Sequence, residues 1–192
     1  MPLDVPSAPA NTFRLAPVEL SHAPLFGFAL VTISCALASF ALACATPFAA
    51  FAVVATAIMP LRSALLVVAG GWLVNQAIGF GALHYPIDAN TILWGFAIGV
   101  AALAATLASA FVLRAVPKMW TPLALTLALI GAYAVYELVL FAVTPFLGGE
   151  ATFIAAIIGW LGLLNVAWAI GLVAACEIVR LVNPFKHRHA VS

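Results

Sequence analysis

Residues 91–113 of the chain read TILWGFAIGVAALAATLASAFVL, a run of 23 residues without a charged side chain. A helix of about 20 apolar residues spans the ~30 Å hydrocarbon core of a bilayer, and this run meets that length. Its apolar residues do not alternate with polar ones, as they would in the strands of a transmembrane barrel. The run therefore predicts a membrane-spanning α-helix, because only helices and closed barrels satisfy their backbone hydrogen bonds in lipid.

Five further apolar segments flank this run and set the fold class. They cover residues 22–45, 47–60, 61–82, 121–146 and 152–181. The second of them lies between Pro47 and Pro60 and would span only about 21 Å at 1.5 Å per residue, so we expect it to be short, tilted or partly buried. We predict an all-α integral membrane protein with six transmembrane helices, arranged as a bundle with a short second helix.

The composition supports this class and excludes others. Apolar residues make up 66% of the 192 residues and charged residues only 7%, with a mean hydropathy of +1.21. Soluble domains carry about 25% charged residues, so a soluble fold is excluded. The net charge of +1 gives no reason to expect a nucleic-acid partner. We predict one membrane domain over residues 22–182, between an N-terminal tail, 1–21, and a basic C-terminal tail, 183–192.

The basic residues decide the predicted orientation. With six crossings and both termini inside, all seven fall on the cytoplasmic side, as the positive-inside rule requires. They are Arg14, Arg62, Arg114, Lys118, Arg180, Lys186 and Arg188. A five-crossing topology with the N-terminus outside would misplace only Arg14, so it stays an alternative. We predict a multi-pass protein of the bacterial cytoplasmic (inner) membrane with both tails in the cytoplasm.

Polar and aromatic residues within the spans gather toward the predicted outer side. In the third span Trp72, Asn75 and Gln76 are spaced at i, i+3 and i+4, which places them on one helical face. The later spans add Asp88, Asn90, Thr91, Trp94, Tyr133, Glu137, Asn165 and Trp168. Polar groups facing lipid are costly, so we expect these side chains to line an outward-facing pocket for a large, mostly neutral, hydrogen-bonding solute.

A structural interpretation of the same residues remains open. The tryptophans could belong to the aromatic belts at the membrane interfaces, which we favour for Trp120 beside Lys118. Asn75, Gln76 and Asn165 could form hydrogen bonds between helices.

Glu137 and His84 are the most distinctive candidates. A carboxylate as far from either helix end as Glu137 is rare and indicates function, although a structural acid bonded to a tyrosine is the alternative. His84 and Tyr85 lie in the loop after the third span, with glycines before them and Pro86 after them. We expect this loop to cap the pocket and His84 to offer its imidazole nitrogen to a metal there.

Part of the sequence resembles a known family. The segments MPLR (59–62), WLVNQAIGF (72–80), YPIDANT (85–91) and WG (94–95) are similar to the BtuM family of cobalamin transporters. That stretch covers roughly a fifth of the chain. The helix number, the short second helix and the outward pocket also resemble the S-components of energy-coupling-factor vitamin transporters more generally. The resemblance implies uptake of cobalamin or related corrinoids across the cytoplasmic membrane, with cobalamin as the transported ligand and no cofactor of the protein's own.

The chain departs from that family at one position. In the BtuM family the loop after the third helix presents a cysteine thiolate to the cobalt, and this cysteine is linked to removal of cyanide. Here no cysteine occurs between Cys44 and Cys176. His84 is the candidate axial ligand instead, because imidazole also binds cobalt, whereas enzymatic decyanation is in doubt.

The resemblance further implies a partner. S-components work with a shared scaffold and ATPase module, although solitary members also exist. Small residues recur at every fourth position of the first span, as in Cys35, Ser39 and Ala43. We expect a partner subunit, where there is one, to dock on this face.

Other functions remain as alternatives. An S-component for biotin, thiamine or riboflavin would use the same aromatic and amide side chains. A nickel or cobalt ion permease would need several His and Asp ligands within a helix, which the spans lack. An intramembrane enzyme would need a paired catalytic set, and Glu137 with His84 is a thin basis for one. A structural assembly subunit is the last alternative.

Overall fold

The computed structural model describes residues 13–42 and 45–182, and all the regular structure in them is helical. The elements are α1 (Ala23–Leu42), α2 (Phe48–Ile58), α3 (Leu61–Ala77), the π-helical turn η1 (Ile78–Ala82), α4 (Ala89–Ala115), α5 (Thr121–Leu147), the 3-10 turn η2 (Glu150–Thr152) and α6 (Ala155–Val182). Each apolar segment expected from the sequence is helical, with bounds within three residues of the prediction. The predicted C-terminal tail and residues 1–12 of the N-terminal tail lie outside the described residues.

Five of these helices are long and apolar enough to cross a membrane: α1, α3 continued by η1, α4, α5 and α6. This confirms a multi-pass helical membrane protein. The second helix, α2, has only 11 residues, which gives a length of about 16 Å. It is too short to cross the ~30 Å hydrocarbon core by itself.

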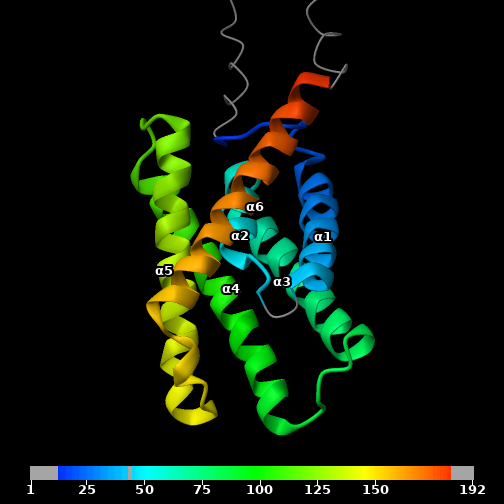
Figure 1. The fold of residues 1–192 in the computed structure, drawn as a ribbon. Coiled ribbons are helices and arrows are strands. Elements are labelled where there is room, and N and C mark those ends of the chain that lie inside the picture. The colour runs from blue at the N-terminus through cyan, green and yellow to red at the C-terminus, as the bar shows by residue number, and fades with distance from the viewer. Residues whose placement is uncertain (1–12, 43–44, 183–192) are drawn as a thin grey trace, which may run out of the picture.

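Helix α2 forms the core of the bundle. Ten of its 11 residues are buried, among them Phe48, Phe51 and Ile58. It contacts α1, α3, α4, α5 and α6, and it lies behind α6 in the middle of the bundle (Figure 1). The second helix was expected to be short, tilted or partly buried, and it is both short and buried among its neighbours. An apolar helix enclosed by other helices is hydrophobic on every side, as FAAFAVVATAI is.

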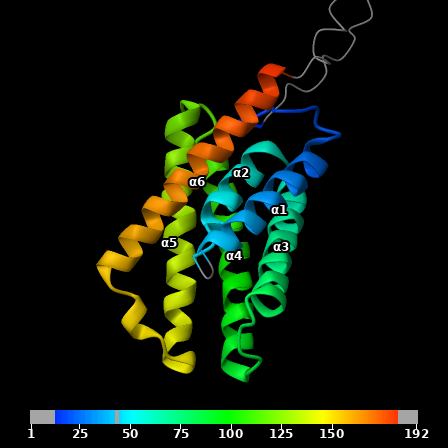
Figure 2. The same cartoon turned by 45° about the vertical axis from the view of Figure 1, so that its right-hand side comes forward.

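The outer helices present their apolar side chains to the surroundings. Leu66, Phe111, Phe146 and Leu181 are each more than 70% exposed, as expected for side chains that face lipid. Small residues on α4, such as Ala101, allow α5 and α2 to approach closely. Helix α6 crosses the bundle obliquely in both views (Figures 1 and 2).

The first and last described residues lie at the same end of the bundle, here termed the terminal end (Figures 1 and 2). Arg14 packs there against the α4–α5 link, where its guanidinium donates hydrogen bonds to the carbonyls of Val116 and Met119. Leu15 is buried and donates its backbone N–H to Ala57. Residues 13–15, which the sequence assigned to a tail, are therefore part of the folded bundle.

Two of the small residues selected on α1 face inward. Cys35 and Ser39 are buried, and the Cys35 thiol donates to the carbonyl of Gly71 on α3 at 3.0 Å. The expectation that this row offers a docking face is wrong for these two residues, because α3 already covers them. Ala43 lies outside the described residues.

Candidate functional site

A cavity of about 140 Å³ lies between α4, α5 and α6, toward the end of the bundle opposite the termini. Its lining comes from the link before α2 (Ala45, Thr46), from α4 (Trp94, Ile98), from α5 (Tyr136, Glu137, Leu140), and from the start of α6 and the residues before it (Phe153, Ile157, Leu161, Asn165). Three of the residues selected from the sequence, Trp94, Glu137 and Asn165, meet here. Glu137 is the single acidic or basic residue among the described residues that line the cavity.

The floor of the cavity is the short link that leads into α2, and two amide side chains hold it. Asn75 on α3 donates from Nδ2 to the hydroxyls of Ser39 and Thr46, both at 2.9 Å. Asn165 on α6 accepts the backbone N–H of Ala50 at 3.1 Å. These bonds fix the point where the chain turns back inside the bundle. Both amides therefore form hydrogen bonds between helices, and Asn165 also lines the cavity.

The wall of the cavity on α5 carries its polar groups. Tyr136 is buried and its ring lies 6.4 Å from that of Phe48 on α2. Glu137 is half-buried and interacts with the hydroxyl of Tyr133, one helical turn earlier. Tyr133 donates in turn to the backbone carbonyl of Ile158 on α6 at 2.6 Å. Tyr133 therefore joins α5 to α6 beside the cavity and supports the Glu137 carboxyl.

Trp94 closes the cavity on the α4 side. A Cβ atom at Gly149, in the link between α5 and α6, would lie 3.2 Å from the Trp94 ring. Gly149 also has φ +91, a conformation that L side chains rarely adopt. A glycine is therefore required at this position, both for the turn and for the close approach of the tryptophan.

Trp72 and Gln76, also selected from the sequence, pack between α3 and α4 instead of lining this cavity. Trp72 donates from Nε1 to the carbonyl of Gly95 at 2.8 Å, and its ring lies over Gly99. Gln76 lies against Gly95 and donates to Asn75 at 3.2 Å. Trp168 packs edge-to-face on Phe51 of α2, with ring centroids 6.1 Å apart.

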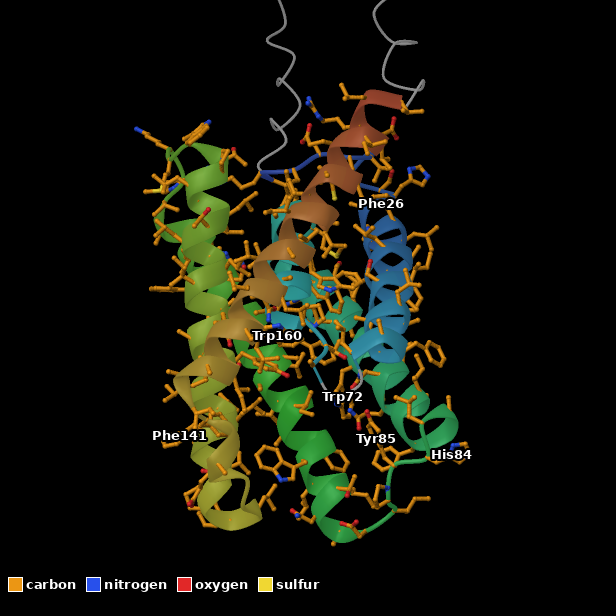
Figure 3. All side chains as sticks on the ribbon, in the orientation of Figure 1. Phe26, Trp72, His84, Tyr85, Phe141 and Trp160 are labelled. Atoms are coloured by element: carbon orange, nitrogen blue, oxygen red, sulfur yellow. The ribbon has the colours of Figure 1, made fainter. Side chains whose placement is uncertain are left out.

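The loop after η1 places His84 at the edge of the bundle. His84 is exposed, has φ 56, and lies on the side away from α5, whereas Tyr85 lies nearer the bundle (Figure 3). The Tyr85 ring covers Gly79 and packs edge-to-face with Phe80. In this conformation neither His84 nor Tyr85 lines the cavity, and the role of His84 as a metal ligand stays a prediction.

Asp88, Asn90 and Thr91 lie at the start of α4, where Asp88 and Asn90 are exposed. The Asp88 carboxylate accepts the backbone N–H of Thr91 at 2.9 Å and its hydroxyl at 3.0 Å, which caps the helix. These two hydrogen bonds, the backbone one first, lower the pKa of Asp88 below 3.8. Asn90 is exposed in the first turn. Asp88 and Thr91 therefore form the cap of the helix. Trp94, one turn further on, lines the cavity.

Several lining residues were not selected from the sequence. Thr46 and Ala45 are one example, because the segment there reads as an apolar run broken only by Pro47. The polar Thr46 directly before that proline was the available signal. Ile98, Ile157 and Leu161 are apolar and carry no signal that separates a cavity wall from a lipid-facing surface.

No group of three or more His, Cys, Asp or Glu side chains in the described part of the chain is placed to hold a metal ion. Cys35 and Cys176 are buried and free. Compared with known protein families, characterised proteins and solved structures, the chain has no match.

Proposed function

We propose that the protein is the substrate-binding component of a vitamin transporter of the energy-coupling-factor type, and that it takes up cobalamin or a related corrinoid into a bacterial cell. The observation that carries this proposal is the cavity between α4, α5 and α6, whose floor is the link into the buried helix α2. Its tryptophan, tyrosine, amide and carboxyl groups suit a neutral solute with many hydrogen-bonding groups. An ion path would need more charged groups than Glu137 alone.

The distribution of charge supports an orientation with the cavity outside the cell. All the described Lys and Arg residues lie at the terminal end: Arg14, Arg62, Arg114, Lys118 and Arg180. The opposite end carries Asp88, Glu150 and His84. Under the positive-inside rule the terminal end faces the cytoplasm. In this orientation the solute enters from outside, and α2 returns the chain from inside the bundle to the cytoplasmic end.

Cobalamin requires a wider site than the cavity of about 140 Å³, because pockets for drug-sized ligands hold about 300–1,000 Å³. We place the corrinoid at the mouth, where movement of the loop after η1 toward α4 brings His84 to the cobalt as its axial ligand. His84 is exposed, and the loop follows η1, a π-helical turn, a form that recurs at functional sites.

The cavity volume favours a second candidate, a smaller vitamin such as biotin, thiamine or riboflavin, which would need less movement of the loop. Either ligand class leaves open a scaffold and ATPase module as the partner that drives release. A nickel or cobalt permease has no support from the side-chain arrangement.

Ligand binding tests the proposal. The purified protein in lipid nanodiscs is titrated with cobalamin, biotin, thiamine and riboflavin by calorimetry, together with two matched variants on α5. Leu140→Trp fills the cavity, whereas Leu138→Trp adds the same ring to a position that is 64% exposed. We expect cobalamin to bind the wild type and Leu138→Trp equally and Leu140→Trp at least about tenfold more weakly, which is 1.4 kcal/mol or more. Binding of another vitamin in its place selects the second candidate, and binding of none rejects both.

A further inference from the structure

A second cavity, of about 490 Å³, lies at the terminal end and is separate from the site described above. It is enclosed by the segment before α1, the junction of α2 and α3, and the end of α4. Its apolar lining includes Phe13, Leu61 and Leu113, and its charged lining is Arg14 and Arg114. The cavity is thus more than three times as large as the one between α4, α5 and α6 and has a different chemical character.

The charge in this cavity is positive without compensation from its lining. Among the described residues that line it, two are arginines and none is acidic. The Arg14 guanidinium is fixed by its bonds to Val116 and Met119, and it keeps further N–H groups beyond the two that these carbonyls accept. Arg114 is exposed and makes no ion pair or hydrogen bond within the described part of the chain. A guanidinium without a partner beside a fixed one is suited to the oxygens of a phosphate group.

The start of α3 adds to the positive electrostatic potential in this cavity. Pro60 and Leu61 line the cavity, and Pro60 provides no side-chain cap for the helix. The first N–H groups of a helix have no acceptor within it, and they form the positive end of its dipole. Arg62 lies in the same first turn. The helix end and the arginines therefore favour an anion at the same place.

The position of the cavity indicates what carries the anion. Phe111 lies one turn before Arg114 on α4 and is 74% exposed, as a lipid-facing side chain is. Trp120, also 74% exposed, lies in the adjoining link, and exposed tryptophans at the ends of spans are typical of the lipid-headgroup region. A lipid beside α4 would then have its phosphate at Arg114 and its acyl chains along Phe111.

We propose that this cavity binds the phosphate group of an anionic phospholipid from the leaflet at the terminal end, held by Arg114, Arg14 and the start of α3. A free phosphate ion offers the same chemistry and is the other possible source. The proposal does not depend on what the protein transports.

The test compares two variants that remove one positive charge each from the same end. Arg114→Gln changes a cavity residue, and Lys118→Gln changes an exposed residue that does not line the cavity. The full-length protein in detergent is titrated with phosphatidylglycerol, with phosphatidylcholine and with inorganic phosphate. Bound lipid is counted by native mass spectrometry, and the midpoint of thermal unfolding is recorded for each addition.

We expect one retained phosphatidylglycerol, a raised unfolding midpoint, and an affinity about five- to tenfold lower in Arg114→Gln only, since a basic residue near the membrane surface contributes about 1 kcal/mol to anionic lipid binding. Protection by inorganic phosphate that is lost in Arg114→Gln also supports the site and identifies free phosphate as its source. Equal losses in the two variants, equal retention of phosphatidylcholine, or no protection by any addition would overturn the proposal. Unchanged circular dichroism of both variants excludes misfolding as the cause of a loss.

Discussion

Asn165 on α6 accepts a hydrogen bond from the backbone N–H of Ala50, in the first turn of α2, at 3.1 Å. Because α2 begins inside the bundle, its first N–H groups cannot reach bulk water, and Pro47 provides no side-chain cap. Asn165 satisfies one of these groups from another helix and donates its own Nδ2 to Leu161 at 3.0 Å. The same side chain lines the cavity, so the support of α2 and the wall of the candidate site share one residue.

Replacement of Asn165 by leucine should lower the stability of the protein. The substitution keeps the side-chain volume but leaves the Ala50 N–H buried without a partner, at a cost of about 1–2 kcal/mol. Thermal unfolding in detergent measures the loss. The control is Leu163→Ala on the same helix, at a position that is 70% exposed. An unfolding midpoint for Asn165→Leu equal to that of the control would show that the bond contributes nothing.

Two glycines at the α3–α4 contact, Gly95 and Gly99, should differ in how much stability the protein loses when each is replaced by alanine. A Cβ at Gly99 would lie 2.7 Å from the rigid ring of Trp72, whereas a Cβ at Gly95 would lie 2.5 Å from the end of the flexible Gln76 side chain. We expect Gly99→Ala to destabilise by about 1–3 kcal/mol and Gly95→Ala by less, because Gln76 can rotate away. Gly159→Ala on α6, with nothing within 4 Å of the new atom, is the control. Thermal unfolding of the three variants in parallel should give that order, and the reverse order for the first two would contradict the packing described.

The Glu137 carboxyl should matter for ligand binding more than for folding. It is the single acidic or basic residue among the described residues of the cavity wall, and Gln in its place keeps the shape but replaces the carboxyl by an amide. We expect Glu137→Gln to weaken binding of the transported vitamin about tenfold, the loss typical of a charged hydrogen bond. Glu150→Gln, an exposed acid outside the lining, should bind as the wild type does. Calorimetric titration measures the affinity of each variant. Equal affinities of the two variants would show that Glu137 does not contribute to ligand binding.

The start of α4 should loosen in acid. The hydrogen bonds from Thr91 hold the folded-state pKa of Asp88 below its ordinary 3.8, so the capping contribution is fully present above that pH and is lost as the pH falls through the folded-state pKa. Hydrogen exchange of the first-turn amides of α4 measures this locally. We expect protection to fall below pH 3.8 in the wild type. In Asp88→Asn protection should not change over the same range, and a parallel fall in the variant would assign the effect to another group.

The sequence determined much of the fold through one property, apolar segment length. The run from Thr91 to Leu113 is long enough to span the bilayer and is helical as expected, and the interruptions at Pro47 and Pro60 predicted the short helix. The sequence could not show that this short helix is buried among the other helices. A run such as FAAFAVVATAI reads alike whether it touches lipid or other helices, because both are apolar.

The candidate site was predictable only in part, for a related reason. A polar residue in a span must avoid lipid, but the sequence does not say whether it meets a ligand or another helix. Asn75 and Trp72 bond to neighbouring helices, whereas Glu137 and Trp94 reach the cavity. Asn165 does both. The distinction depends on which side chains face each other across helices, and spacing along one helix does not contain that information.

The visible absorption spectrum of the purified protein from cells supplied with a corrinoid tests cobalamin binding most directly. The wild type is compared with His84→Ala and with His22→Ala, an exposed histidine at the terminal end. We predict that a corrinoid band co-purifies with the wild type and with His22→Ala, and that it is shifted or lost in His84→Ala. A colourless wild-type protein that also fails to bind added cobalamin would contradict the assignment of cobalamin as the substrate.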